Sequence, residues 1–198
     1  MKIRTALAII VLLACSSVGY GGTISDISCY NDGDGAITMN NWYANVADPE
    51  DTVGMDETLH WFPAHALVDV TVEGDPIVTI TKEVENGTTF DWTDYHIQIS
   101  RPSTQGVFSI LTATPPEGWS AVINDVGLVG SEYVGSVDYT GGAPVLIGDS
   151  GIFKVKLSFA NTANFCLEQV PTPEPGTLVL LATGLVGLLA YAWRHRRS

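Results

Sequence analysis

Basic side chains are scarce in this sequence. It holds nine Lys and Arg residues against 22 Asp and Glu, a formal net charge of −13. Most of the basic residues lie at the two chain ends. Residues 23–176 therefore carry four basic side chains against all 22 acidic ones, a formal charge of −18. Nucleic-acid binding depends on basic groups that displace the counterions of phosphates. This charge argues strongly against a nucleic-acid partner.

Cysteine is also rare, with three residues in the chain. Cys15 falls in the leader described below, which leaves Cys29 and Cys166 as a pair. Disulfides persist in the compartments that exported proteins enter. The pair predicts a bridge that ties the first strand to the last. Closing that loop of roughly 140 residues would stabilise the fold by about 4–5 kcal/mol on the chain-entropy model. Two small buried hydrophobic side chains are the alternative.

Helical periodicity is absent from residues 23–170. This segment contains short runs rich in β-branched and aromatic residues, separated by Gly, Pro, Asn and Asp turns. Such a pattern predicts an all-β sandwich or barrel. Alternation is clearest in residues 152–159, where apolar and polar side chains take turns. We therefore expect one all-β domain with strands at residues 24–30, 36–46, 67–73, 77–84, 95–100, 107–112, 121–123, 133–139, 152–159 and 165–167.

The N-terminal segment, residues 1–22, has the zones of a secretory signal peptide. Lys2 and Arg4 form a positive start, residues 6–14 are an unbroken apolar run, and small residues follow. The apolar run is too short to span a bilayer. We predict that this leader directs export and is removed. Lipidation of Cys15 is an alternative.

The C-terminal segment has three zones in a fixed order. Residues 171–176 are rich in proline, which favours an extended backbone. Residues 177–193 carry no charge and would reach roughly 26 Å as a helix, enough to span a thin bilayer. Arg194, Arg196 and Arg197 follow. By the positive-inside rule they form a cytoplasmic stop. The segment predicts a transmembrane helix that leaves the domain outside.

This order of Pro-Glu-Pro, membrane helix and basic terminus resembles the PEP-CTERM sorting signal of Gram-negative environmental bacteria. The resemblance covers residues 171–198. It implies that Pro173, Glu174 and Pro175 are recognised by an exosortase, which cuts near them. The protein would then be held only transiently in the inner membrane and pass to the cell surface or an exopolysaccharide matrix. Further passages at residues 75–76 and 86–96 are similar to other such proteins, which implies an immunoglobulin-like β-sandwich ectodomain.

No enzyme is predicted. Residues 148–151 read Gly-Asp-Ser-Gly, like the nucleophile loop of chymotrypsin-like proteases, but the next residue is Ile152 and no His has the usual setting. The favoured function is a non-enzymatic surface or extracellular-matrix protein. The alternative is a carbohydrate-binding module retained in exopolysaccharide, because exposed aromatic rings stack on sugars. The aromatic candidates are Trp42, Tyr43, Trp61, Phe62, Trp92, Tyr95 and Trp119. A coplanar, exposed cluster of these rings would favour carbohydrate binding, and burial of all of them would count against it.

No cofactor is predicted, but one stretch leaves calcium open. Residues 31–35 read Asn-Asp-Gly-Asp-Gly and place two carboxylates, Asp32 and Asp34, in a flexible turn. Calcium takes six to eight oxygen ligands from such bent, acidic loops. The spacing fits an EF-hand poorly. A solvated acidic hairpin turn is therefore the favoured interpretation, with a calcium site as the alternative.

Overall fold

The fold is built almost entirely of β-strands. A computed structural model describes residues 23–31, 33–45, 51–73, 77–160, 163–173 and 183–186. Within these residues lie eleven strands, a short 3₁₀-helix, η1 (Ser103–Gln105), and one helical turn at residues 183–186. The strands are β1 (Thr23–Asn31), β2 (Ile37–Asn45), β3 (Asp51–Leu59), β4 (Ala64–Glu73), β5 (Ile77–Asn86), β6 (Trp92–Pro102), β7 (Phe108–Thr114), β8 (Ser120–Val129), β9 (Glu132–Val145), β10 (Ser150–Phe159) and β11 (Ala163–Pro173).

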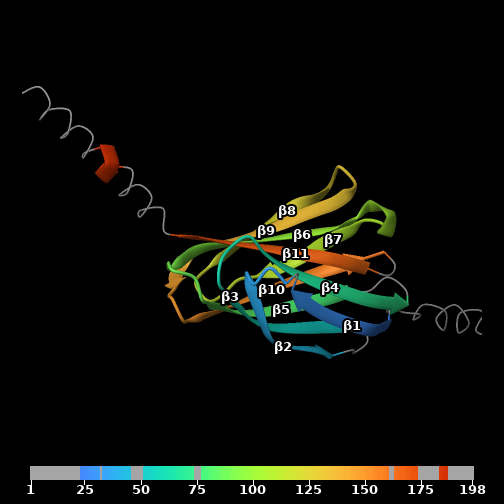
Figure 1. Cartoon of the computed structure of the whole chain (residues 1–198). Coiled ribbons are helices and arrows are strands. Elements are labelled where there is room, and N and C mark those ends of the chain that lie inside the picture. Colours follow the sequence, from blue (N-terminus) through green and yellow to red (C-terminus); the bar gives the residue numbers. More distant parts are fainter. Residues whose placement is uncertain are drawn as a thin grey trace, which may run out of the picture.

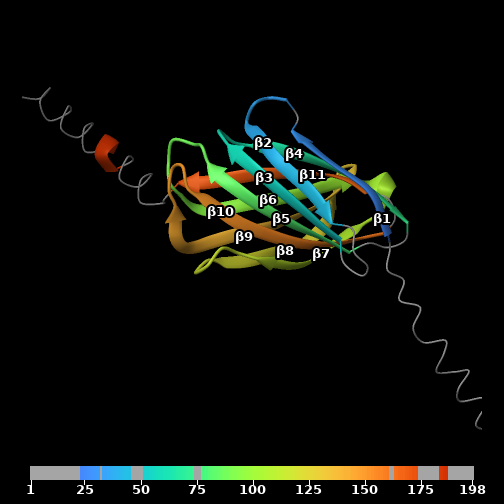
Figure 2. The same ribbon diagram turned by 90° about the horizontal axis from the view of Figure 1, so that it is seen from below.

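The strands form two sheets that lie face to face (Figures 1 and 2). The six-stranded sheet has the order β1-β4-β11-β6-β9-β8, and the five-stranded sheet has the order β2-β3-β5-β10-β7. Neighbouring strands run antiparallel except β3 and β5, which are parallel. The chain crosses to the other sheet through β4 between these two parallel strands. The prediction of an all-β fold is confirmed, and two sheets over a common core make it a sandwich.

The core lies between the sheets and follows the period-two pattern of the strands. In β10, Phe153, Val155, Leu157 and Phe159 are buried, while the residues between them are exposed or half-buried. The sequence alternation at residues 152–159 therefore predicted this strand and its inner face correctly. Val78, Ile80 and Val84 on β5 and Ile97 and Ile99 on β6 extend the same interior.

Aromatic side chains join the two sheets at the centre of the core. The Phe153 ring stacks on Tyr95 with centroids 4.1 Å apart, and meets Tyr139 and Trp119 edge-on at 5.1 and 6.0 Å. The Tyr139 hydroxyl donates a hydrogen bond to the backbone oxygen of Lys154 at 2.9 Å. Phe153 and Lys154 belong to β10, Tyr95 and Tyr139 belong to β6 and β9 of the six-stranded sheet, and Trp119 directly precedes β8. This cluster therefore holds the layers together.

The structure differs from the sequence expectations at two places, where a strand is formed by residues that are typical of loops. β3 was not expected, because Asp51, Gly54 and Glu57 are poor strand formers. In the structure Asp51 and Glu57 are buried, and the Tyr43 ring covers Gly54. The Gly141-Gly142 pair does not end a strand either. β9 continues through it with both glycines at positive φ, and the pairing with β6 skips several residues there.

Candidate functional site

The sorting segment begins inside the sandwich. β11 lies between β4 and β6, and its pairing with β6 continues through Pro171, Thr172 and Pro173. The expected domain end at residue 170 is thus three residues short of the strand end. Pairing with β4 stops at Gln169, so the last part of β11 has a described partner on one side. Proline has no N–H to donate and is tolerated where a strand is paired on one side. This explains how two prolines extend the strand.

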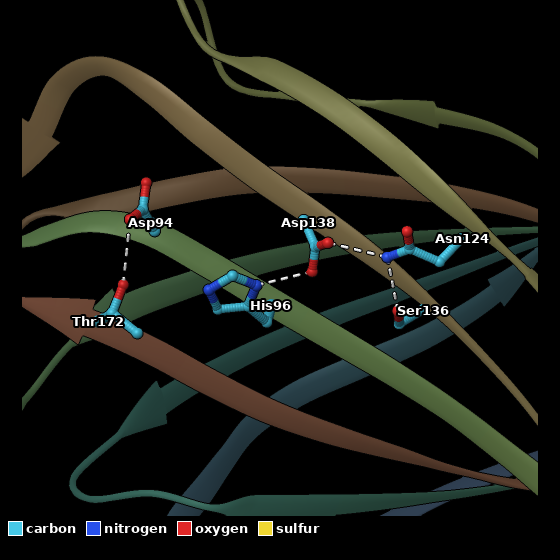
Figure 3. Close-up of polar contacts among 6 residues, drawn as sticks. All are labelled: Asp94, His96, Asn124, Ser136, Asp138 and Thr172. Carbon is cyan, nitrogen blue, oxygen red and sulfur yellow. Dashed lines mark hydrogen bonds and ion pairs between the residues drawn. The ribbon is translucent and has the colours of Figure 1, made fainter.

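The end of β11 is anchored by packing and by one side-chain hydrogen bond. Pro171 is buried, and its register partner Tyr95 is fully buried. Pro173 lies opposite Trp92, another fully buried ring. The Thr172 hydroxyl donates to Asp94 Oδ2 at 3.4 Å (Figure 3). Pro173 is the one Pro-Glu-Pro residue within the described part; Glu174 and Pro175 lie outside it.

A strip of polar side chains continues from Asp94 across the outer face of the six-stranded sheet (Figure 3). His96 Nδ1 lies 2.7 Å from Asp138 Oδ1, and the Asn124 amide donates to Asp138 Oδ2 at 2.8 Å and to Ser136 Oγ at 2.9 Å. Partial burial acts to raise the pKa of Asp138, but the hydrogen bonds from His96 and Asn124 outweigh it. The pKa is therefore lowered. The side chains of this strip are hydrogen-bonded to one another, and none of them is arranged as an activated nucleophile.

The structure does not join the two mature cysteines. Cys29 on β1 pairs with Val68, and Cys166 on β11 pairs with Leu67, so β4 lies between them. Two strand spacings are roughly 10 Å, beyond the ~7 Å that a disulfide allows between Cα atoms. Val68 and Leu67 are consecutive and face opposite sides of the sheet, so the thiols do as well. The predicted disulfide is therefore wrong, and no disulfide joins these two described residues.

The acidic turn after β1 organises itself through local hydrogen bonds. Asp34 Oδ1 accepts from the Ala36 backbone N–H at 2.7 Å, and Asn31 Oδ1 accepts from the Gly33 N–H at 3.0 Å. Asp32 lies outside the described residues. Within the described residues no three His, Cys, Asp or Glu side chains gather as a metal site would require. These contacts are typical of a turn, and the calcium alternative stays a prediction.

The aromatic residues divide into a buried and an exposed group. Trp92, Tyr95 and Trp119 belong to the core. Trp61 and Phe62, in the turn between β3 and β4, are exposed. Trp42 and Tyr43 lie on the edge strand β2, and Tyr43 is 55% exposed. Of the seven rings considered, all within the described residues, the four exposed ones therefore lie on β2 and in the β3–β4 turn.

Tyr43 forms one wall of a shallow groove on the outer face of the five-stranded sheet. Its ring lies against Gly54, where an added Cβ would meet the ring at 2.0 Å. The groove has a volume of about 200 Å³. Two register rows build it: Asn41, Asp56 and Glu83, then Tyr43, Gly54 and Thr81. An aromatic face thus lies beside two carboxylates, an amide and a hydroxyl. No sequence pattern pointed to this arrangement, because it joins three strands across the parallel pair.

Several predicted features fall where the structure gives no description. The signal peptide at residues 1–22, including Cys15, lies outside the described residues, as do Arg194, Arg196 and Arg197. Of the predicted helix at 177–193, only the turn at residues 183–186 is described. None of the described helical segments has the length and apolar character needed to cross a membrane.

Comparison with known protein families supports the predicted sorting signal at the C-terminal segment. A family model for the PEP-CTERM protein-sorting motif matches residues 171–197. No curated protein and no solved structure matches the chain. The matched segment begins at Pro171, the buried residue of β11 that pairs with Tyr95. The chain therefore carries a PEP-CTERM protein-sorting motif that begins on its last described strand, the mark of an exported protein sorted through an exosortase.

Proposed function

We propose that this protein is a non-enzymatic component of the cell surface or extracellular matrix. A leader at residues 1–22 directs its export, and a helix at residues 177–193 holds it transiently in the inner membrane until an exosortase acts. The sorting motif at residues 171–197 carries this proposal. The strongly acidic segment 23–176 suits a soluble, exposed domain. We also propose that the sorted protein is placed in an exopolysaccharide matrix.

The finer fold type is also a proposal. An immunoglobulin-like sandwich is supported by two mostly antiparallel sheets over one core and by the buried Trp92 and Trp119. The parallel pair β3–β5 and the eleven described strands depart from the standard immunoglobulin arrangement. The type is therefore best understood as a variant with additional strands.

The end of β11 restricts where the sorting enzyme can cut. A protease binds several residues of extended chain in its cleft, and residues 163–173 are hydrogen-bonded within a sheet. Cutting before Pro173 would remove part of a strand that pairs with β6 opposite the buried Trp92 and Tyr95. We therefore place the scissile bond on the C-terminal side of Pro173.

Processing can be followed by mass spectrometry of the surface-associated protein from the native host. We expect a mature C-terminus beyond Pro173 and no peptide containing residues 191–193. A Glu174→Ala variant is expected to retain those residues, because the motif is no longer recognised, while Glu117→Ala in the β7–β8 turn serves as a matched control. A surface form that still contains Tyr191 and Trp193 would contradict exosortase processing.

A second candidate function is binding of a neutral glycan, and the Tyr43 groove is the observation that favours it. Sugars present a C–H face that stacks on an aromatic ring, and hydroxyls that donate to carboxylates and amides. Tyr43 offers the ring, while Asp56, Glu83 and Asn41 offer acceptors. The two carboxylates would repel an anionic polysaccharide, so the ligand proposed here is uncharged.

Affinity electrophoresis in gels that contain soluble neutral polysaccharides, such as dextran or xyloglucan, tests this candidate. Retardation of the parent protein is expected, with about a tenfold or greater loss for Tyr43→Ala, since burial of a large apolar side chain contributes about 1.5–3 kcal/mol and about 1.4 kcal/mol is a tenfold change in affinity. Gly54→Ala should weaken binding as well, because its Cβ displaces the Tyr43 ring. Trp61→Ala, an exposed ring outside the groove, is the control. Equal migration of all four proteins across the polysaccharide set would reject the groove.

A further inference from the structure

Four polar side chains form an island in the apolar core. Glu57 on β3 and Lys82 on β5 come from the five-stranded sheet, and Tyr95 on β6 and Gln169 on β11 come from the six-stranded sheet. Their exposed fractions are 0%, 1%, 0% and 0%. Lys82 Nζ contacts Glu57 Oε1, and the Tyr95 hydroxyl donates to Gln169 Oε1. Burial, and then the charge of Glu57, raise the pKa of Tyr95 well above its ordinary value, so the two pairs are electrostatically coupled.

The pair of Glu57 and Lys82 has few other bonds. Neither carboxylate oxygen of Glu57 accepts a hydrogen bond in the described structure apart from its ion-pair contact with Lys82. The other described contact of Lys82 Nζ is Met55 Sδ at 4.0 Å. A buried ion pair recovers its desolvation cost only when further hydrogen bonds satisfy both partners. As an ion pair, this arrangement is therefore poorly stabilised.

The same arrangement suits amide formation. Lys82 is the register partner of Met55 in the parallel pair, and Glu57 is two residues further on the same inward face. The amine nitrogen and the carboxyl carbon are thus held together in a site that excludes water, and proximity of this kind replaces a bimolecular encounter. We propose that Lys82 and Glu57 join in an intramolecular isopeptide bond.

The reaction needs no co-reactant. Transfer of one proton from the Lys82 ammonium to the Glu57 carboxylate produces a neutral amine and a carboxylic acid. The bond from Nζ to Cδ of Glu57 forms, the bond from Cδ to one carboxyl oxygen breaks, and a second proton passes from nitrogen to the departing hydroxyl. The product is an amide and one water. Burial then protects the amide, because hydrolysis would require water to return.

The bond would close a covalent loop around the segment that crosses between the two sheets. It closes the loop from residue 57 to residue 82, and this loop contains β4, which pairs in the other sheet. An exported domain whose cysteines are too far apart to bridge would thereby gain a covalent tie between neighbouring strands β3 and β5. The neutral amide would also remove the two poorly bonded charges from the core.

Peptide mapping of the full-length protein after denaturation tests the bond. Glu-specific protease should leave residues 51–73 joined to residues 74–83, because cleavage after Glu57 requires a free carboxylate. The joined species should be about 18 Da lighter than its two parts, the loss of one water on covalent modification. Trypsin should fail to cut after Lys82. Separate linear peptides ending at Glu57 and at Lys82 would overturn the proposal, and a link from Lys82 to Gln169 with loss of ammonia would overturn the assignment to Glu57.

Intact mass of variants gives a second readout. Lys82→Arg keeps the positive charge but cannot form this amide, so its mass should equal the sum of its residues after leader removal. Lys154→Arg, at an exposed position on β10, should keep the loss of one water. If Lys82→Arg does not fold, the map of the parent protein still decides, since it needs no variant.

Discussion

A chain that starts at Thr23 and ends at Val170 is expected to unfold about 6–12 °C below one that ends at Pro173. Both lack the membrane segment, so they differ only in the last three residues of β11. Losing those residues removes the buried Pro171 and the strand pairing opposite the buried Tyr95 and Trp92. At about 25 cal/mol per Å² of apolar surface, this corresponds to a loss of about 3 kcal/mol. For a domain of this size each kcal/mol lowers the melting temperature by about 2–4 °C.

Thermal unfolding followed by circular dichroism measures the difference. Equal melting temperatures would mean that residues 171–173 contribute nothing to the folded domain, and the restriction on the cleavage position would be lost. A large difference would mean that the domain and its sorting signal share a strand. The enzyme must then act on a chain that leaves the fold directly at the Pro-Glu-Pro motif.

The sequence predicted those parts of the protein that depend on local pattern. The alternation from Ile152 to Phe159 identified β10 because both its faces follow from a two-residue period. The turn at residues 31–35 follows from Asn, Asp and Gly chemistry. The sorting motif was recognised because its three zones are contiguous. Each of these signals is complete within about 30 residues of chain.

The remaining features depend on contacts between distant residues. β3 escaped notice because Glu57 is compatible with a buried strand only when Lys82 of the neighbouring strand pairs with its carboxylate, and Gly54 only when Tyr43 covers it. The disulfide prediction failed because the position of β4 between β1 and β11 is a property of the topology. β11 continues three residues beyond the expected domain end at residue 170, although proline opposes strands in general. Here β11 accepts it beyond Gln169, where β4 no longer pairs.

The centre of the core offers the second large effect. Phe153→Ala is expected to destabilise the domain by about 3–5 kcal/mol, since it removes a fully buried ring and leaves a cavity. The ring contacts Tyr95 and Tyr139 of the opposite sheet and Trp119 directly before β8, so the loss falls on the contacts that hold the layers together. The melting temperature should fall by about 6–20 °C at 2–4 °C per kcal/mol.

Ile152→Ala is the matched control, because the neighbouring side chain points to the other face of the same strand and is 48% exposed. Its cost should be about 0.5–1 kcal/mol, the size of a strand-propensity effect. Urea denaturation of both variants, with the slope of the unfolding free energy compared between them, separates lost packing from a changed unfolded state. If the two variants were equally stable, Phe153 would not be the centre of the sandwich. The assignment of inner and outer faces, including the outward position of the Tyr43 groove, would then have to be reversed or abandoned. A large difference in the expected direction would support both faces at once, because a single residue of offset along a strand exchanges core for solvent.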